Sequence, residues 1–167
     1  MKPLERKRGV AVRRATEADL AVVTELRLAL LREHASDVLY GRVRPNVTAT
    51  ARRLYLAQLG SRDEVTFLAQ RGSQISGILR CVHSRGYPLL LPPEYGYVSS
   101  VYVIPEARRS GVLTSLLRQA EKWCRDRGLT EMRLHSGSDN ALSNATWDAL
   151  GFAVVEHLRM RPLKPEE

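Results

Sequence analysis

The sequence predicts a single α/β domain of the α+β-like type, in which about four helices pack on a mixed, mostly antiparallel sheet of six to seven strands. Three observations lead to this fold class. The chain has 167 residues, of which 44% are apolar, and this is enough for one domain with its own core. Its hydrophobic pattern follows the order strand, two helices, three strands, helix, strand, helix, strand. No internal repeat or low-complexity segment interrupts that order.

The N-terminal third of this pattern contains one strand and two helices. Residues 9–14 alternate as in a short strand. Thr16 then precedes an amphipathic run over residues 20–34, which is typical of a capped helix. Residues 47–62 show the helical spacing again, and Gly60 marks the end of this second helix.

The remainder of the chain predicts two hairpin strands, a central strand, a helix, a strand, a short helix and one or two final strands. Their expected ranges are 64–70, 75–84, 96–105, 112–127, 130–136, 138–152 and 152–163. A Gly-containing turn separates the hairpin strands, and valine and tyrosine dominate the central strand up to Pro105. Gly128 and Gly151 stand where the two helices are expected to end.

Composition excludes several classes of protein. The chain has no apolar run of the about 18 residues that a membrane span needs, so we expect a cytoplasmic protein without a membrane partner. Its two cysteines, Cys81 and Cys124, are too few for a disulfide framework and lack the spacing of a zinc site. We therefore expect two buried or half-buried thiols without a chemical role, and no metal.

The net charge of +8 is concentrated at the N-terminus. Residues 1–15 carry six Lys or Arg and one Glu, which leaves +3 for the rest of the chain. We expect a flexible basic arm over residues 1–8 and one domain over residues 9–167. The alternative is a module that binds nucleic acid or protein through this arm, and the weak charge of the remainder argues against nucleic acid.

The segment PEARRSGVLTSLLRQAEKW, residues 105–123, joins the central strand to a helix. The first N–H groups of that helix and the positive end of its dipole form an anion site at the edge of the sheet. Gly111 lets the backbone approach a ligand, and Arg108 and Arg109 suit phosphate oxygens. Neither a dinucleotide fingerprint nor a Walker loop is present. On the pattern alone, a solvated pair of arginines explains the segment equally well.

This segment and a second one, NALSNATWDALGF, resemble the GNAT superfamily of acyl-CoA N-acyltransferases. The family signature is Arg or Gln, two residues, Gly, one residue, and Gly or Ala, which corresponds here to Arg108, Gly111 and Leu113. The later family pattern of Asn, Ala, Tyr and Gly-Phe corresponds to Asn140, Ser143, Trp147, Gly151 and Phe152. In element order the resemblance covers nearly the whole chain, and it is most specific over residues 95–155.

Two departures from the family pattern matter. Leu113 stands where a second small residue normally lets the pyrophosphate lie close, although its backbone N–H can still donate. Trp147 stands where many relatives carry a tyrosine thought to protonate the departing thiolate, and an indole N–H is only a hydrogen-bond donor. The resemblance therefore implies the fold and the cofactor, but no general acid at Trp147.

The resemblance implies that acetyl-CoA lies in a V-shaped opening between two neighbouring strands, residues 96–104 and 130–136. The pantetheine arm pairs with the first strand, where a backbone N–H near Ser100 stabilises the oxyanion. The pyrophosphate meets the turn after that strand, and the last helix faces the cofactor's lower arm, unless Trp147 is a plain core residue. The expected cofactor-binding residues are Val101, Val103, Arg108, Arg109, Ser110, Gly111, Val112, Leu113, Thr114, Asn140, Ser143 and Trp147.

A substrate amine that attacks directly must lose a proton, because it is mostly protonated at neutral pH. Glu94, at the mouth of the central strand, is the first candidate for the base, and a solvated loop carboxylate is the alternative. Tyr97 and Ser99, which we place on one strand face with Val101, are catalytic candidates that line the acceptor site, or half-buried strand residues without a chemical role. His135 can relay a proton or be structural.

These inferences predict an N-acetyltransferase that moves an acetyl group from acetyl-CoA to a primary amine. The alternative is a domain that holds acyl-CoA without catalysis, since the tyrosine is replaced and the base is not identified. The loops expected to shape the acceptor site, residues 34–47 and 84–94, mix acidic and basic side chains, whereas a polycationic aminoglycoside needs an acidic cleft. We therefore expect an uncharged or anionic, amino-acid-like small amine rather than a protein acceptor, and we allow for a homodimer.

Overall fold

The computed structural model describes residues 9–163 of the chain. These residues form two compact units that divide after His135. The basic arm expected at residues 1–8 lies outside the described residues, and the single domain expected over residues 9–167 stays a prediction.

The first unit contains a five-stranded sheet in the order β1-β2-β3-β4-β5. The strands are β1 (Ala11–Arg14), β2 (Glu64–Arg71), β3 (Gln74–Arg85), β4 (Glu94–Val103) and β5 (Met132–Arg133). Strands β1 to β4 pair in antiparallel fashion, and β5 joins β4 in parallel. The expected mixed, mostly antiparallel sheet and its hairpin are confirmed.

Three α-helices of the first unit cover this sheet: α1 (Leu20–Glu33), α2 (Val47–Leu59) and α3 (Val112–Arg125). Short 3-10 turns, η1 (Glu17–Asp19) and η2 (Pro105–Ala107), precede α1 and α3. Helix α2 ends at Gly60, as expected. None of the helices in the described part of the chain has the length and hydropathy of a membrane span.

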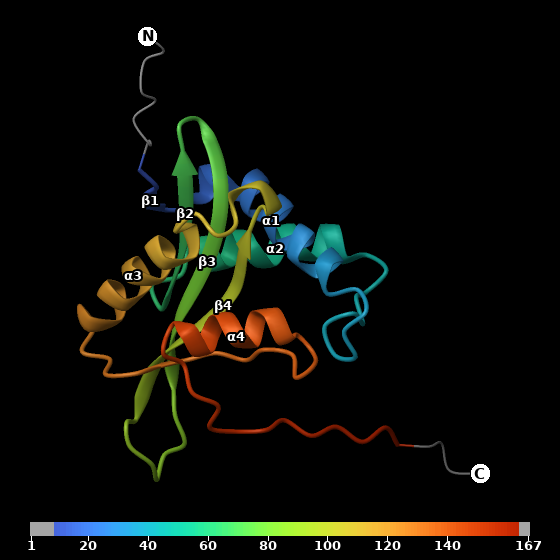
Figure 1. Cartoon of the computed structure of the whole chain (residues 1–167), viewed down its shortest axis with the longest axis vertical. Coiled ribbons are helices and arrows are strands. Elements are labelled where there is room, and N and C mark those ends of the chain that lie inside the picture. The colour runs from blue at the N-terminus through green and yellow to red at the C-terminus, as the bar shows by residue number, and fades with distance from the viewer. Residues whose placement is uncertain (1–8, 164–167) are drawn as a thin grey trace. The chain divides into compact units, whose positions relative to one another are not determined.

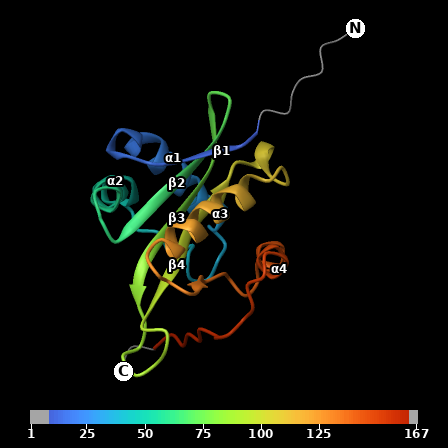
Figure 2. The same ribbon diagram turned by 90° about the vertical axis from the view of Figure 1, so that its left-hand side faces the viewer.

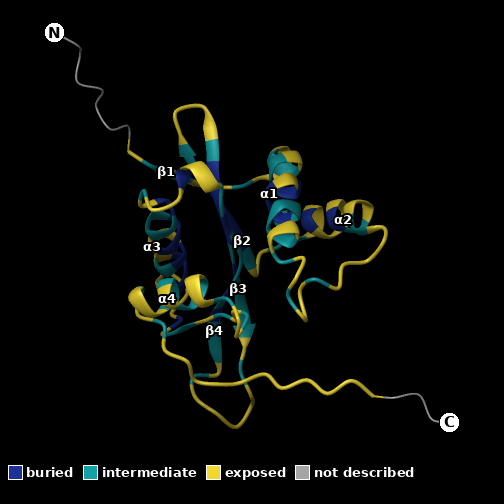
Figure 3. Cartoon of the chain, turned by 45° about the vertical axis from the view of Figure 1, so that its right-hand side comes forward, coloured by how far each residue is buried: buried dark blue, intermediate teal, exposed yellow. Residues whose placement is uncertain are grey.

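The helices lie on opposite faces of the sheet, with α1 and α2 on one side and α3 on the other (Figures 1 and 2). Apolar side chains of α1 and α2 meet the sheet at Leu68, Ile78 and Tyr102, and these residues are buried. Helix α3 has the strongest amphipathic pattern of the chain and packs Leu116 and Ala120 inward. The buried residues in Figure 3 accordingly lie along the strands and the inner faces of these helices.

Cys81 of β3 and Cys124 of α3 meet between the sheet and α3, with their sulfur atoms 3.6 Å apart. Both are buried, which confirms the expectation of buried thiols. Gly96 of β4 makes room for them, because a Cβ at this position would lie 2.4 Å from the Cys124 sulfur. The small residue therefore lets α3 pack closely against β4.

The second unit contains one helix, α4 (Ala141–Ala149), as the sequence predicts. Residues 152–163 have no regular secondary structure, and Val155 and Leu158 are exposed. The expected final strands are therefore wrong, and the sheet has five strands rather than six to seven. The strand expected at 130–136 is shortened to β5. An apolar, alternating pattern describes the faces of a strand, but a strand forms only where a neighbouring backbone pairs with it.

Candidate functional site

Strand β4 contains a bulge at Ser100. Tyr102 lies opposite Ile78 of β3, but Ser99 lies opposite Arg80, so three steps along β4 match only two along β3. Ser100 adopts a left-handed backbone conformation with φ of 51°, which is unusual for a residue with a side chain. The extra residue interrupts the ladder and bends the strand at this point.

The bulge reverses the direction in which β4 presents its backbone. Gly96 N–H donates to Glu131 O on the β5 side at 3.0 Å, whereas Ile104 N–H donates to Ser76 O of β3 at 3.0 Å. In a regular strand, two residues separated by an even number of positions face the same neighbour. Beyond the bulge, Val101 and Val103 therefore turn their N–H groups away from β3.

The pairing between β4 and β5 ends before the bulge. Within the described chain, the parallel ladder of β4 and β5 consists of two pairs, Gly96 with Met132 and Tyr97 with Arg133. From Val98 onward no described strand pairs with β4 on its β5 side, and we call this unpaired side the opening. The N–H groups of Val101 and Val103 face it. Exposed N–H groups in a row can pair with an extended ligand as a neighbouring strand does.

The turn after β4 leads directly into the start of α3. Gly111 is the N-cap and has φ of 82°, a left-handed conformation, and a Cβ placed there would meet no atom within 4 Å. Ser115 N–H donates to Gly111 O at 3.0 Å, which is the first bond of the helical ladder. The N–H groups of Val112, Leu113 and Thr114 precede this bond and have no partner within the helix. Together with the helix dipole they form a site for an anion.

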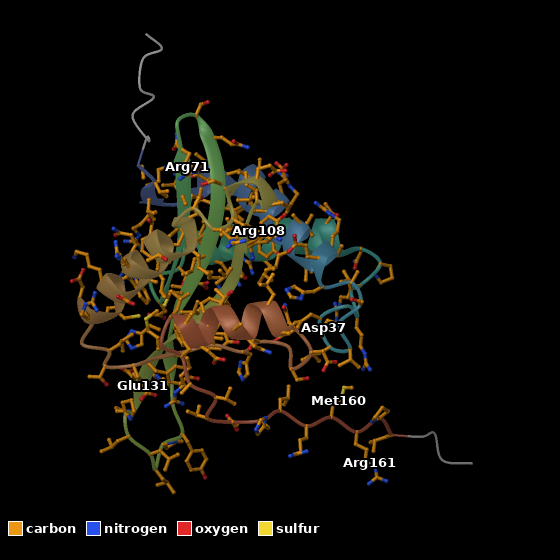
Figure 4. The ribbon with its side chains drawn as sticks, in the orientation of Figure 1. Asp37, Arg71, Arg108, Glu131, Met160 and Arg161 are labelled. Carbon is orange, nitrogen blue, oxygen red and sulfur yellow. The ribbon has the colours of Figure 1, made fainter. Side chains whose placement is uncertain are left out.

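The two arginines of the turn differ in their surroundings. Arg108 forms an ion pair with Glu33 at the end of α1, and its Nε donates to Val103 O at 2.9 Å. Arg109 is exposed, has φ of 57° and takes part in no ion pair among residues 9–163. Arg71, from the β2–β3 hairpin, adds a third guanidinium, whose Nη2 donates to Ser110 O at 3.3 Å (Figure 4). Arg108 thus links α1 to the turn, while Arg109 remains available to a phosphate.

Leu113, the irregular residue of the signature, lies half-buried in the first turn of α3. Val112 next to it is buried against the sheet side of the helix. The Leu113 backbone belongs to the unpartnered helix start, so the position offers its N–H despite the larger side chain.

Tyr97 and His135 form a hydrogen-bonded pair where β4 and β5 separate. The Tyr97 hydroxyl lies 2.8 Å from His135 Nδ1. Burial raises the pKa of the Tyr97 phenol, and the nearby Tyr40 and Tyr95 hydroxyls add to the rise. The phenol therefore stays protonated at neutral pH and can donate to the unprotonated nitrogen of His135.

The other two catalytic candidates are held by neighbouring side chains. Ser99 Oγ accepts a hydrogen bond from Arg80 at 3.0 Å, and Arg80 also pairs with Glu64. Glu94 Oε2 lies 2.9 Å from His83 Nε2, although the pair is not aligned for a hydrogen bond. The Glu94 carboxylate is 44% exposed, so it resembles a solvated group with a basic neighbour.

The structure corrects the expected face of Val101. Because Tyr102 lies opposite Ile78 and Ser99 opposite Arg80, Ser99 and Tyr102 point to the same side of the sheet. Val101 precedes Tyr102 and points to the other side. A regular alternation would have placed Val101 with Tyr97 and Ser99, and the bulge at Ser100 is the reason that it does not.

The expected residues of the last helix occupy the second unit. Asn140 is the N-cap of α4, and its side-chain oxygen accepts the Ser143 N–H at 3.1 Å. Trp147 is half-buried and packs edge-on against Phe152, with ring centroids 5.4 Å apart. It is therefore not a fully buried core residue. Whether these three residues contact a cofactor stays a prediction.

Sequence reasoning missed the side chains that hold the predicted residues. Glu33 pairs with Arg108, Arg80 with Ser99, and His83 lies beside Glu94. Each partner lies on another element, and no local motif marks it. Within residues 9–163, no group of three or more His, Cys, Asp or Glu side chains is placed to hold a metal ion.

A comparison with protein families matches residues 28–152 to the acetyltransferase (GNAT) family. The chain belongs to this family. An aminoglycoside N(6')-acetyltransferase type 1 from Stenotrophomonas maltophilia is 30% identical over 157 residues, which cover 92% of this chain and 94% of that protein. A protein of the same description from Acinetobacter haemolyticus is 43% identical over 61 residues, or 36% of this chain. This shorter match spans only 42% of the relative's length.

Solved structures of GNAT proteins share the fold. An aminoglycoside 6'-N-acetyltransferase from Acinetobacter haemolyticus aligns with a TM-score of 0.74 and 26% identity, over 93% of this chain and 99% of that chain. A predicted acetyltransferase from Clostridium acetobutylicum, solved with acetyl-CoA, aligns with a TM-score of 0.75 and 18% identity, over 92% of this chain and 96% of that chain. These alignments support the GNAT fold.

Proposed function

We propose that this GNAT protein transfers an acetyl group from acetyl-CoA to a primary amine of a small molecule. One observation carries the proposal: the bulge at Ser100 turns the Val101 and Val103 N–H groups into the opening between β4 and β5. The same strand runs into the anion site at Gly111. An extended thioester with a charged pyrophosphate needs both features, in this order along the chain.

The described residues fit acetyl-CoA in shape and charge. Val101 and Val103 offer backbone N–H groups to the amides of the pantetheine arm. The open space beside Gly111 gives the pyrophosphate room to approach the helix start, where any side chain would block it. Arg109 and Arg71 add positive charge at the same turn.

Acetyl transfer requires that the substrate nitrogen attacks the thioester carbonyl, so that a C–N bond forms and the C–S bond breaks. A backbone N–H near Ser100 and Val101 stabilises the negative charge that develops on the carbonyl oxygen. The nitrogen also loses one proton, and the leaving thiolate takes one up. Because a thiol has a pKa of roughly 8.5, this last proton transfer does not need a dedicated acid.

The Tyr97–His135 pair supports a route for the substrate proton. Its hydrogen bond lies where β4 and β5 separate, next to the opening. We assign the proton transfer to this pair, with His135 as the group that accepts a proton. Glu94 and Ser99 remain candidates, but Ser99 is held by Arg80 and Glu94 lies beside His83.

Two other readings share the same fold. A domain that binds acyl-CoA without turnover is supported by Trp147, which replaces a possible proton donor. An aminoglycoside acceptor is supported by the descriptions of the relatives, which are aminoglycoside N(6')-acetyltransferases. The loops at 34–47 and 84–94 mix acidic and basic side chains, whereas a polycationic substrate favours an acidic cleft. A homodimer and a cytoplasmic location stay predictions.

The test combines calorimetric titration of CoA with an assay of thiol release. Acetyl-CoA is incubated with a panel of neutral, anionic and polycationic amines, and free thiol is followed over time. We expect CoA binding and turnover of at least one small amine. Tight CoA binding without turnover of any amine supports the silent domain, and absence of CoA binding overturns the proposed function.

A further inference from the structure

A pocket of about 240 Å³ lies between α1, α2 and the loop that joins them. Its walls are mostly apolar and include Leu31, Val43 and Leu54, and Tyr40 enters from the loop. Tyr55, which is buried, also lines it. The volume is slightly below the range of roughly 300–1,000 Å³ for sites of small ligands, so it suits one ring or branched alkyl group.

Positive charge surrounds this apolar pocket. Arg42 and Arg44 line it, and both are exposed and without an ion pair among the described residues. Arg27 stacks on the Tyr55 ring, 3.6 Å from its centroid. Burial lowers the pKa of Arg27 to about 10, which leaves it charged at neutral pH.

No acidic side chain balances this charge among the residues that line the pocket. Asp37, in the same loop (Figure 4), is the nearest acid along the chain to Tyr40. Its Oδ1 accepts the Leu39 and Tyr40 N–H groups, both at 2.8 Å. Burial and, after it, the nearby Asp37 carboxylate raise the pKa of the Tyr40 phenol, so Asp37 acts on one wall of the pocket. The charged side chains that line the pocket itself are Arg42 and Arg44.

The pocket lies beside strand β4, because Tyr55, which lines it, belongs to the same buried cluster as Tyr102 of β4. Tyr102 and Tyr97 point to the same side of the sheet. Tyr97 in turn contacts His135 at the opening between β4 and β5. The pocket is therefore on the face of the sheet to which Tyr97 points, beside the strand that leads to the expected acetyl group.

We propose that the pocket holds the acceptor, and that the acceptor is a small amine with an apolar body and a carboxylate, as in an apolar amino acid. The inference rests on the proposed acetyl transfer and names its substrate class. The apolar body packs on Leu31, Val43 and Leu54, and the carboxylate meets Arg42 or Arg44. A polycation would place like charges near these arginines, which is unfavourable even in partly solvated surroundings.

The test compares amines that carry a carboxylate with amides that lack it and with a polycation. L-Phenylalanine, L-leucine and 4-(aminomethyl)benzoate are assayed for thiol release against L-phenylalaninamide, L-leucinamide and the aminoglycoside kanamycin. We expect kcat/KM for at least one amino acid to exceed kcat/KM for its amide by about 10-fold or more. We expect kcat/KM for all three carboxylates to exceed kcat/KM for kanamycin by the same factor. We expect Arg42→Ala or Arg44→Ala to lower the ratio of kcat/KM for the carboxylate to kcat/KM for its amide by about 10-fold.

Arg53→Ala is the matched control, because Arg53 is exposed on α2 but does not line the pocket. It removes the same charge from the same region and is expected to leave the preference unchanged. CoA affinity, measured by calorimetry, is expected to be equal in all variants. A general electrostatic effect of charge would instead reduce the preference in all three variants alike and would overturn the assignment of the pocket.

A binding experiment separates this inference from the proposed function. N-Acetyl-L-phenylalanine and its amide are titrated into the protein, which requires no turnover. Binding of the acid that weakens at least about 5-fold in the arginine variants supports the pocket even if no amine is acetylated. Preference for kanamycin, or absence of any carboxylate effect in both assays, overturns the inference while CoA binding and acetyl transfer can still stand.

Discussion

Beyond Ser100, strand β4 offers backbone N–H groups to a ligand, whereas before Ser100 it offers side chains. The part after Ser100, the cofactor half, leads through Val103 to the helix start at Gly111, where the donors belong to the main chain. The part before Ser100, the side-chain half, holds Tyr97 and Ser99, whose hydroxyls meet His135 and Arg80. A site built from main-chain groups depends on backbone shape, and a site built from side chains depends on which neighbours the fold supplies. The two halves should therefore respond differently to mutation.

Gly111→Glu is expected to have the largest effect and to act on the cofactor half alone. The new side chain would enter the open space beside the helix start and place a negative charge in the path of the pyrophosphate. We expect CoA affinity, measured by calorimetry, to fall at least about 100-fold. Gly128→Glu is the control, since Gly128 has φ of 72° and equally open space, but lies beyond the other end of α3. CoA affinity at the wild-type level in Gly111→Glu contradicts the site.

Tyr97→Phe is expected to have the second largest effect and to act on the side-chain half alone. It removes the hydroxyl that meets His135 and keeps the ring. We expect kcat for the best amine to fall about 10- to 100-fold, with unchanged CoA affinity. Tyr87→Phe, in the exposed loop before β4, is the control and is expected to retain kcat. Equal rates in Tyr97→Phe and wild type would remove the pair from the proton route.

Arg109→Ala and Arg108→Ala separate a cofactor contact from a structural one. Arg109 is free of ion pairs in the described chain, and we expect its loss to weaken CoA binding about 10-fold. Arg108 is engaged by Glu33 and Val103 O, so we expect less than about 3-fold for Arg108→Ala. Its loss should instead cost up to about 1 kcal/mol in the free energy of unfolding, as should Glu33→Ala. The reverse order of affinities would show that Arg108 leaves Glu33 for the phosphate.

Ser100→Gly is expected to have the smallest effect, and it tests the boundary between the two halves. A left-handed conformation costs a residue with a side chain about 1–2 kcal/mol, and glycine avoids this cost but loses more entropy on folding. We expect the free energy of unfolding in urea to rise by up to about 1 kcal/mol, with kcat/KM changed less than about 3-fold. Ser99→Gly, in regular strand geometry, is expected to destabilise the protein. Equal losses in both variants would argue against the strained bulge.

Local patterns predicted most of the first unit. The amphipathic runs of α1 and α3, the hairpin around Gly72 and the end of α2 at Gly60 depend on residues close together in sequence. The prediction of final strands at 152–163 is wrong because a strand depends on a partner that is distant in sequence. Their apolar alternation is present, but pairing needs a neighbouring backbone that no local pattern can guarantee.

In the candidate site, too, some features follow from local sequence and others only from the tertiary structure. The left-handed turn and helix start at Gly111 follow from local spacing and residue type, and anion binding there stays a prediction. The contact of Arg108 with a phosphate also stays a prediction. The ion pair of Arg108 with Glu33, 75 residues away, is a feature that only the structure shows. Val101 was expected on the face of Tyr97, and the bulge at Ser100 moves it to the other face.

Sequence alone was sufficient for the family, the mixed antiparallel sheet and the turn that starts α3, because each depends on short-range periodicity or on a motif of fixed spacing. Only the tertiary structure decided which groups β4 presents before and after Ser100, and that Tyr40, Arg42 and Arg44 line an apolar pocket between α1 and α2. These features arise from packing between elements that are distant in the chain. Their energies depend on partners that a one-dimensional pattern does not specify.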